Sequence, residues 1–201
     1  NLLCEEMKDE LLGILAQIEA DERLRVIILT GAGQKAFCAG RNLQESRSWQ
    51  EAGDPSLLKA VWDRGNRLID CVLSYPKITI AALNGLALGG GCELTLPFDF
   101  VIAERTVKIG LPEARRGLFP GTGAMKLLPK KVGLFRAREM IFLGKVLDAG
   151  DALAWGLVNM VVDQKALDAA YELAARLRTV SFGAILQAKA IMNSHEGWPR
   201  A

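Results

Sequence analysis

Histidine is almost absent from this sequence of 201 residues: His195, near the C-terminus, is the only one. Hydrolases with a serine or cysteine nucleophile need a base oriented beside that nucleophile, and histidine usually fills the role. The four cysteines have no short paired spacing, which argues against a zinc site or a redox CxxC motif. We therefore expect free thiols, no metal, and chemistry that depends on carboxylates, backbone amides, lysine or a cofactor.

An excess of charge of either sign is also missing. The 25 basic and 23 acidic residues leave a formal net charge of +2, which gives no reason to expect polyanion binding as the main role of the surface. Half of the residues are hydrophobic, as in a compact globular domain with a sizeable core. No low-complexity segment or Pro/Ser-rich linker divides the chain, so we predict a single domain over residues 1–201.

An uninterrupted apolar run of membrane-spanning length is lacking as well. The most apolar stretch covers residues 78–103, but Asn84, Glu93, Asp99 and three consecutive glycines interrupt it. We expect a buried strand, a turn and a helix there. No signal peptide is visible, so secretion is not expected.

Helix and strand patterns alternate along the chain. Hydrophobic residues recur at helical spacing from Met7 to Ile18, and a short β-branched run at 26–30 predicts a buried strand. The alternation indicates a mostly parallel α/β architecture, and pattern alone leaves a doubly wound sheet and a spiral both open. Further strands are predicted at 36–38, 78–82, 100–103, 107–109 and 158–162, and further helices at 58–72, 92–96, 126–132, 136–143, 149–155, 167–178 and 184–192.

Glycine-rich segments are the first candidates for a ligand site. The chain has no G-x-x-x-x-G-K-[ST] loop, and neither 31–33 nor 121–123 completes G-x-G-x-x-G. Gly89-Gly90-Gly91 stands between a predicted strand and a predicted helix, where backbone N–H groups can approach a ligand and stabilise a developing oxyanion. Taken alone, the triplet is explained more simply by close packing of helix on sheet.

Two glutamates in mainly apolar surroundings, Glu93 and Glu113, are the candidate acid–base groups. Carboxylates are rarely buried without a partner or a chemical role. Glu113 follows Gly110-Leu111-Pro112, so we expect it at the start of a helical turn, where its charge also compensates the helix dipole. Each glutamate taken singly is explained better by a structural or exposed position than by catalysis.

Three segments together resemble, in order and spacing, the signature segments of the enoyl-CoA hydratase/isomerase (crotonase) family. They are FCAGRNL at 37–43, NGLALGGGCELTLPFDFVIAE at 84–104 and KIGLPEARRGLFPGTGAMKLLPKKVG at 108–133. Residues 137–162 resemble that family's continuation. The match covers most of the chain.

The resemblance implies an α/β fold built as a spiral of ββα repeats over 1–165, with 166–201 as the start of a C-terminal helical region. It also implies that the chain begins after the family's usual first strand and ends before its last helices. The implied partners are an acyl-CoA thioester and further copies of the chain in a homotrimer or hexamer, with no separate cofactor, no membrane span and no nucleic acid. The expected location is the cytoplasm in a bacterium or the mitochondrial matrix in a eukaryote.

By position, the resemblance also implies the site. Glu93 and Glu113 match the two catalytic glutamates of the family's hydratases, and the backbone N–H groups of Arg41 and Gly90 match its oxyanion hole. Most members have Asp where Asn42 stands and a small or apolar residue where Arg41 stands, so the charge of this loop differs while its backbone donors need not. The implied substrate-binding residues are Ala39, Arg41, Asn42, Leu43, Gly90 and Gly121.

The implied activity is hydration of a trans-2-enoyl-CoA in fatty acid metabolism. The two amides polarise the thioester carbonyl, Glu93 acts chiefly as base toward water, and Glu113 chiefly donates a proton to the α-carbon. The alternatives are a Δ3-Δ2 enoyl-CoA isomerase, in which the second carboxylate is commonly missing, or another acyl-CoA lyase. An RNA-binding relative is an alternative of another class, but residues 5–25 carry seven acidic and three basic residues, whereas phosphate contacts need the opposite balance.

Overall fold

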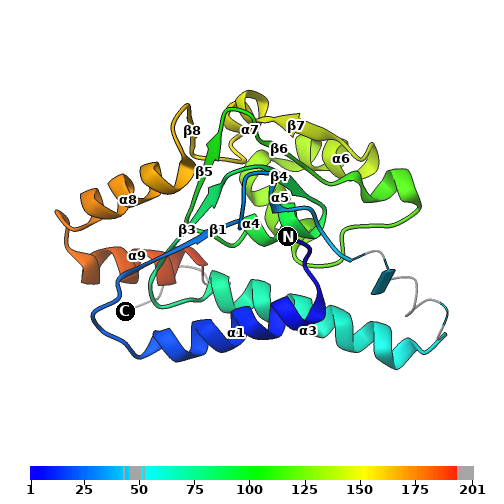
Figure 1. Cartoon of the computed structure of the whole chain (residues 1–201), viewed down its shortest axis with the longest axis horizontal. Helices are drawn as coiled ribbons and strands as arrows, with labels where there is room; N and C mark the ends of the chain where they lie inside the picture. The colour runs from blue at the N-terminus through cyan, green and yellow to red at the C-terminus, as the bar shows by residue number, and fades with distance from the viewer. Residues whose placement is uncertain (43, 46–50, 52, 194–201) are drawn as a thin grey trace.

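Two four-stranded sheets form the frame of the chain in the computed structural model, which describes residues 1–42, 44–45, 51 and 53–193 (Figure 1). Neighbouring strands are parallel except for the last pair of the second sheet. The first sheet contains, in order, β1 (Val26–Thr30), β3 (Ile78–Leu83), β5 (Phe100–Glu104) and β8 (Met160–Val162). The second contains β2 (Ala36–Cys38), β4 (Leu86–Leu88), β6 (Lys108–Gly110) and β7 (Val146–Asp148).

Successive strand pairs contribute one strand to each sheet. The pairs β1–β2, β3–β4 and β5–β6 each cross from the first sheet to the second. Helical segments return the chain to the first sheet after β2 and β4, whereas after β6 the chain adds β7 to the second sheet before α7 leads back to β8 in the first. This arrangement confirms the predicted spiral of ββα units. The helices are α1 (Glu5–Glu19), α3 (Pro55–Leu73), α4 (Gly90–Thr95), the 3₁₀ helix η1 (Pro112–Arg116), α5 (Ala124–Val132), α6 (Leu134–Phe142), α7 (Ala149–Trp155), α8 (Ala166–Leu177) and α9 (Phe182–Asn193).

The hydrophobic core has two parts because β3 is buried on both faces. Side chains alternate along a strand, so Ala81 and Leu83 face the main core, while Ile78, Ile80 and Ala82 face the other side. Helices α8 and α9 cover that other side and lie beside the first sheet in Figure 1. Burial on both faces explains why β3 is a continuous apolar run in the sequence.

A buried ion pair fixes α9 to the first sheet. Lys189 Nζ lies 2.7 Å from Asp99 Oδ2 and also donates a hydrogen bond to the carbonyl of Lys77 at 2.8 Å. The same Asp99 oxygen accepts the backbone N–H of Thr79 at 2.8 Å. Asp99, which interrupts the long apolar stretch, is therefore a structural link between two strands and a helix.

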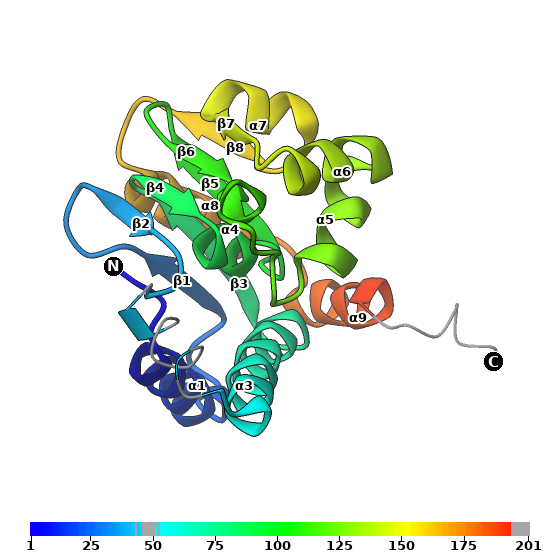
Figure 2. The same ribbon diagram turned by 90° about the vertical axis from the view of Figure 1, so that its right-hand side faces the viewer.

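Helices α1 and α3 pack side by side at one end of the molecule, as both views show (Figures 1 and 2). The predicted elements are confirmed with shifts of a few residues at their ends, and the short strands β4 and β7 have no counterpart among the predicted strand ranges. The four cysteines, all in the described part of the chain, form no disulfide. Within the described residues, no helix combines the length and apolarity that a membrane crossing requires.

Candidate active site

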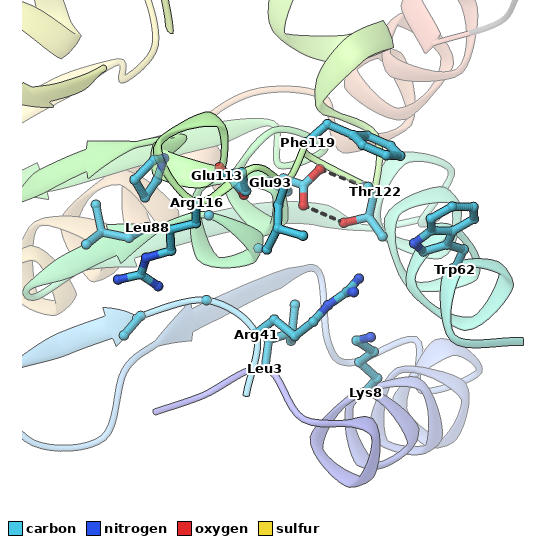
Figure 3. Close-up of a pocket in the computed structure, with 17 residues that line it drawn as sticks. Leu3, Lys8, Arg41, Trp62, Leu88, Glu93, Glu113, Arg116, Phe119 and Thr122 are labelled. Carbon is cyan, nitrogen blue, oxygen red and sulfur yellow. Dashed lines mark hydrogen bonds between the residues drawn. The ribbon is translucent and has the colours of Figure 1, made fainter. Parts of the chain in front are cut away.

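The three segments that resemble family signatures meet at one edge of the second sheet. Strands β2, β4 and β6 are parallel neighbours there, with Cys38 paired to Ala87 and Leu88 paired to Gly110. The segments that follow these strands therefore emerge side by side. They line a cavity of about 340 Å³, together with parts of α1 and α3 (Figure 3).

Most of the predicted site residues line this cavity: Ala39, Arg41, Gly90, Glu93, Glu113 and Gly121. Asn42 does not line it, and its side-chain oxygen accepts the backbone N–H of Gln44 at 3.0 Å. A contact of Asn42 with coenzyme A stays a prediction. Leu43 and the sole histidine, His195, lie outside the described residues.

The two predicted oxyanion donors belong to backbone segments that face one another. A Cβ atom placed on Gly90 would lie 3.7 Å from the backbone nitrogen of Arg41, and one placed on Gly40 would lie 3.5 Å from the nitrogen of Gly90. Gly40 and Gly89 have φ angles of +95° and +55°, which a side chain would strain. The backbone of both segments thus approaches the same part of the cavity.

The chain's first residues hold the 39–41 segment in place. Leu3 forms a parallel bridge with Arg41, and its N–H donates to the carbonyl of Gly40 at 2.8 Å. The N–H of Ala39 donates to the carbonyl of Asn1 at 2.9 Å. These bonds hold the 39–41 segment in place where it leaves strand β2.

The packing explanation for the glycine triplet applies at Gly91, while the oxyanion role of Gly90 stays a prediction. A Cβ on Gly91 would lie 2.0 Å from the carbonyl oxygen of Cys38, so Gly91 is required for packing α4 against β2. Gly90 lines the cavity instead. Helix α4 begins at Gly90. The N–H of Gly90 therefore belongs to the first turn, whose N–H groups have no acceptor within the helix.

Glu93 is almost fully buried, with only 4% of its surface exposed. Its Oε1 accepts the backbone N–H of Thr122 at 2.7 Å, and its Oε2 accepts the Thr122 hydroxyl at 2.9 Å (Figure 3). Burial raises the pKa of Glu93 to about 7, against the opposing effect of these two bonds. A carboxylate with such a pKa is suited to proton transfer at neutral pH.

Glu113, on η1, faces the same cavity. Its Oε1 lies 2.9 Å from the point where a Cβ would stand on Gly89. Its Oε2 is buried and has no hydrogen-bond partner in the described part of the structure, a costly arrangement unless a ligand supplies a donor. Burial raises the pKa of Glu113, although the charges of Arg41 and Arg116 oppose this effect.

Thr122 is a site residue that sequence reasoning missed. The segment 121–123 was considered as an incomplete nucleotide signature and, through the family resemblance, for Gly121, but nothing in the pattern pairs Thr122 with Glu93. The threonine fits because α3 has a glycine opposite it: a Cβ on Gly65 would lie 2.3 Å from Thr122 Cγ2. The other cavity residues that the sequence did not indicate include Leu3, Lys8, Trp62, Leu88, Arg116 and Phe119.

Comparison with known protein families and sequences confirms the family resemblance. A model of the enoyl-CoA hydratase/isomerase family matches residues 1–197. The human mitochondrial enoyl-CoA hydratase domain-containing protein 2 is 39% identical over 178 residues, which are 88% of this chain and 60% of that protein. The 1,2-epoxyphenylacetyl-CoA isomerase of Escherichia coli is 38% identical over 198 residues, or 98% of this chain and 75% of that enzyme.

A solved structure shows the same fold. The enoyl-CoA hydratase of Bacillus anthracis matches with a TM-score of 0.88 and 36% identity, over 96% of this chain and 74% of that one. The chain thus spans between 60% and 75% of the lengths of these three proteins. On the family match and the shared fold together, this chain belongs to the enoyl-CoA hydratase/isomerase family.

Proposed function

We propose that this protein is a hydratase that adds water across the 2,3 double bond of a trans-2-enoyl-CoA thioester. The observation that carries the proposal is the presence of two carboxyl groups, Glu93 and Glu113, in one cavity beside the backbone nitrogens of Arg41 and Gly90. Hydration requires one proton to leave water and another to reach carbon. Two carboxyl groups with raised pKa values supply both transfers.

The backbone donors act on the thioester carbonyl. In the proposed complex, its oxygen accepts hydrogen bonds from the N–H groups of Arg41 and Gly90. Charge grows on this oxygen when water adds to the β-carbon, because the electrons of the double bond move toward an enolate. An aligned donor that binds this charge lowers the barrier by roughly 3–4 kcal/mol.

The carboxyl groups complete the proton balance. Glu93 accepts a proton from the attacking water, whose oxygen bonds to the β-carbon. Glu113 delivers its proton to the α-carbon as the enolate collapses, and the proton on Glu93 then returns to Glu113 through solvent. A carboxylate has about four acceptor sites, so Glu93 can still hold the water it activates besides the donors of Thr122 and Ala124.

Steady-state assays test this proposal against isomerisation. An isomerase moves one proton between two carbons of the same chain, for which a single carboxylate suffices. We expect rapid loss of absorbance from short trans-2-enoyl-CoA thioesters, and much slower conversion of the 3-enoyl isomers. Conversion of 3-enoyl thioesters alone would contradict the proposal.

The Thr122 hydroxyl should tune the pH dependence of the reaction. Thr122→Val keeps the side-chain volume and the backbone N–H but removes the hydroxyl that donates to Glu93 Oε2. The ionised carboxylate then loses one stabilising hydrogen bond, so the pKa of Glu93 should rise above about 7. Because the base must be ionised, the acid limb of kcat/KM should move upward by roughly one pH unit.

Thr122→Ser is the matched control, because it restores the hydroxyl. Activity at the pH optimum should change little in either variant. A Thr122→Val profile with an unchanged acid limb, measured on a protein of normal thermal stability, would show that Glu93 is not the ionised base.

Assembly and coenzyme A binding remain part of the proposal. A trimer or hexamer would cover apolar side chains that this single chain exposes around α5 and α6, among them Met125, Phe135 and Phe142, which are 56%, 83% and 69% exposed. Coenzyme A would lie along the segment that follows β2. The proposed reaction requires no metal or redox cofactor.

A further inference from the structure

We propose that Lys8 determines which acyl group the site prefers: one with a keto or hydroxyl oxygen beyond the β-carbon, in place of a plain alkyl chain. The inference rests on the proposed function, which places the β-carbon of an acyl-CoA thioester at Glu93. Lys8 lines the cavity, and Figure 3 shows its side chain reaching from α1 toward Arg41 and Trp62.

Lys8 occupies a position on α1 where the helical pattern favours an apolar side chain. The buried residues of this helix are Lys8 and Leu15, which are about two turns apart and therefore lie on one face. Only 2% of the surface of Lys8 is exposed. Lysine is almost never buried to this extent without a partner or a function.

An ion pair accounts for only part of this burial. Lys8 Nζ lies 2.6 Å from Glu5 Oε1, and Glu5 Oε2 lies 2.7 Å from a guanidinium nitrogen of Arg64. Burial opposes ionisation of Glu5, but the hydrogen bonds from Lys8 and Arg64 lower its pKa below the ordinary value. An ammonium group has three donors, and the bond to Glu5 is the only one that Lys8 Nζ makes in the described part of the chain. Two donors remain, and the cavity that Lys8 lines is where a ligand atom can reach them.

These donors lie on the side of the cavity where the acyl chain should continue. A Cβ on Gly65 would lie 3.9 Å from Lys8 Nζ and 2.3 Å from Thr122 Cγ2, so the ammonium group neighbours that threonine. Thr122 in turn holds both oxygens of Glu93. In the proposed reaction Glu113 serves the α-carbon and Glu93 the β-carbon. The atoms beyond the β-carbon therefore continue past Glu93 toward Thr122 and Lys8.

The charges around Lys8 favour a neutral oxygen as the acceptor. Glu5 already balances the charge of Lys8, and an anionic acyl chain would also face Glu93 and Glu113 in the same cavity. A keto or hydroxyl oxygen accepts a hydrogen bond from the ammonium group without adding charge. An alkyl chain would remove the same donors from water and offer no acceptor, which weakens binding.

Two pairs of saturated thioesters test the inference without requiring turnover. 4-Oxopentanoyl-CoA and 4-methylpentanoyl-CoA have similar shapes and differ in one acceptor oxygen, and 5-oxohexanoyl-CoA and 5-methylhexanoyl-CoA repeat the comparison one carbon further along. By isothermal titration calorimetry, we expect the keto member of at least one pair to bind about ten-fold more tightly than its alkyl partner. A purely apolar pocket would give the reverse order. Equal or reversed affinities in both pairs would overturn the inference.

Lys8→Met assigns the preference to this side chain. Methionine has a similar length and no donor, and Glu5 keeps its ion pair with Arg64, so the variant should fold, which thermal unfolding would verify. We expect the keto preference to fall to about two-fold or less. Lys59→Met is the matched control, because it removes an exposed lysine of α3 that pairs with Asp63, and it should leave the preference unchanged. A keto preference that persists in Lys8→Met would overturn the assignment to Lys8.

The possible outcomes separate this inference from the proposed reaction. Equal affinities within both pairs, in a protein that hydrates short enoyl-CoA substrates, would overturn the role of Lys8 alone. A keto preference that Lys8→Met abolishes, in a protein without hydratase activity, would support the role of Lys8 and contradict the proposed reaction.

Discussion

Glu113→Gln should lower kcat for hydration of a short trans-2-enoyl-CoA by roughly 10²- to 10⁴-fold, while leaving the affinity for the thioester nearly intact. The substitution removes a transferable proton and little volume. It also leaves an amide where Glu113 Oε2 now lies buried without a partner in the described structure. Turnover by absorbance and binding by calorimetry separate the two effects.

Glu10→Gln is the matched control, because Glu10 is an exposed carboxylate of α1 outside the cavity. It should leave both quantities unchanged. Near-normal turnover of Glu113→Gln would remove this residue from the mechanism. Equal losses of binding and turnover would instead assign it to substrate binding.

Gly90→Pro should lower kcat/KM by roughly 10²- to 10³-fold, because proline has no N–H to offer the thioester oxygen. Gly90 is the first residue of α4, and proline is well tolerated at the first position of a helix. The variant should therefore fold, which thermal unfolding would verify. Its defect should be in catalysis more than in stability.

Gly90→Ala separates the lost donor from added bulk. Alanine keeps the N–H, and its Cβ would lie 3.3 Å from the flexible end of Leu3, which can move by a few tenths of an ångström. We expect this variant to retain far more activity than Gly90→Pro. Similar losses in both variants would show that the shape of the cavity at Gly90, and not its hydrogen bond, limits the reaction.

The alternation of helices and strands could be predicted from local pattern because each element carries its own periodicity. The strand β3 is a continuous apolar run, and α3 has a clear amphipathic spacing. The strand β7 could not be predicted, because its three residues are too few to show an alternation. Its antiparallel pairing with β6 is determined by tertiary packing.

The site required more than local pattern. Taken singly, Glu93 and Glu113 looked structural, and only the family resemblance joined them. Physically, they meet because β4 and β6 pair in parallel, which places the segments after Leu88 and Gly110 side by side. That pairing depends on the whole spiral, so spacing along the chain could not reveal it.

Contacts between residues far apart in the chain could not be predicted from the sequence. The bonds from Thr122 to Glu93 depend on the space left by Gly65 on α3. Trp62 and Arg41 likewise approach Gly121 from two separate segments of the chain. The contacts of Thr122 with Gly65 and of Gly121 with Trp62 depend on the packing of α3 against the segment that follows η1.

The origin of the oxygen in the product tests the central claim most directly. The wild-type protein is given a short trans-2-enoyl-CoA and its 3-enoyl isomer in water enriched in ¹⁸O, and the products are analysed by mass spectrometry. The account predicts a 3-hydroxyacyl-CoA that carries one labelled oxygen, formed first from the trans-2-enoyl thioester. Interconversion of the two enoyl thioesters without any uptake of label would contradict it.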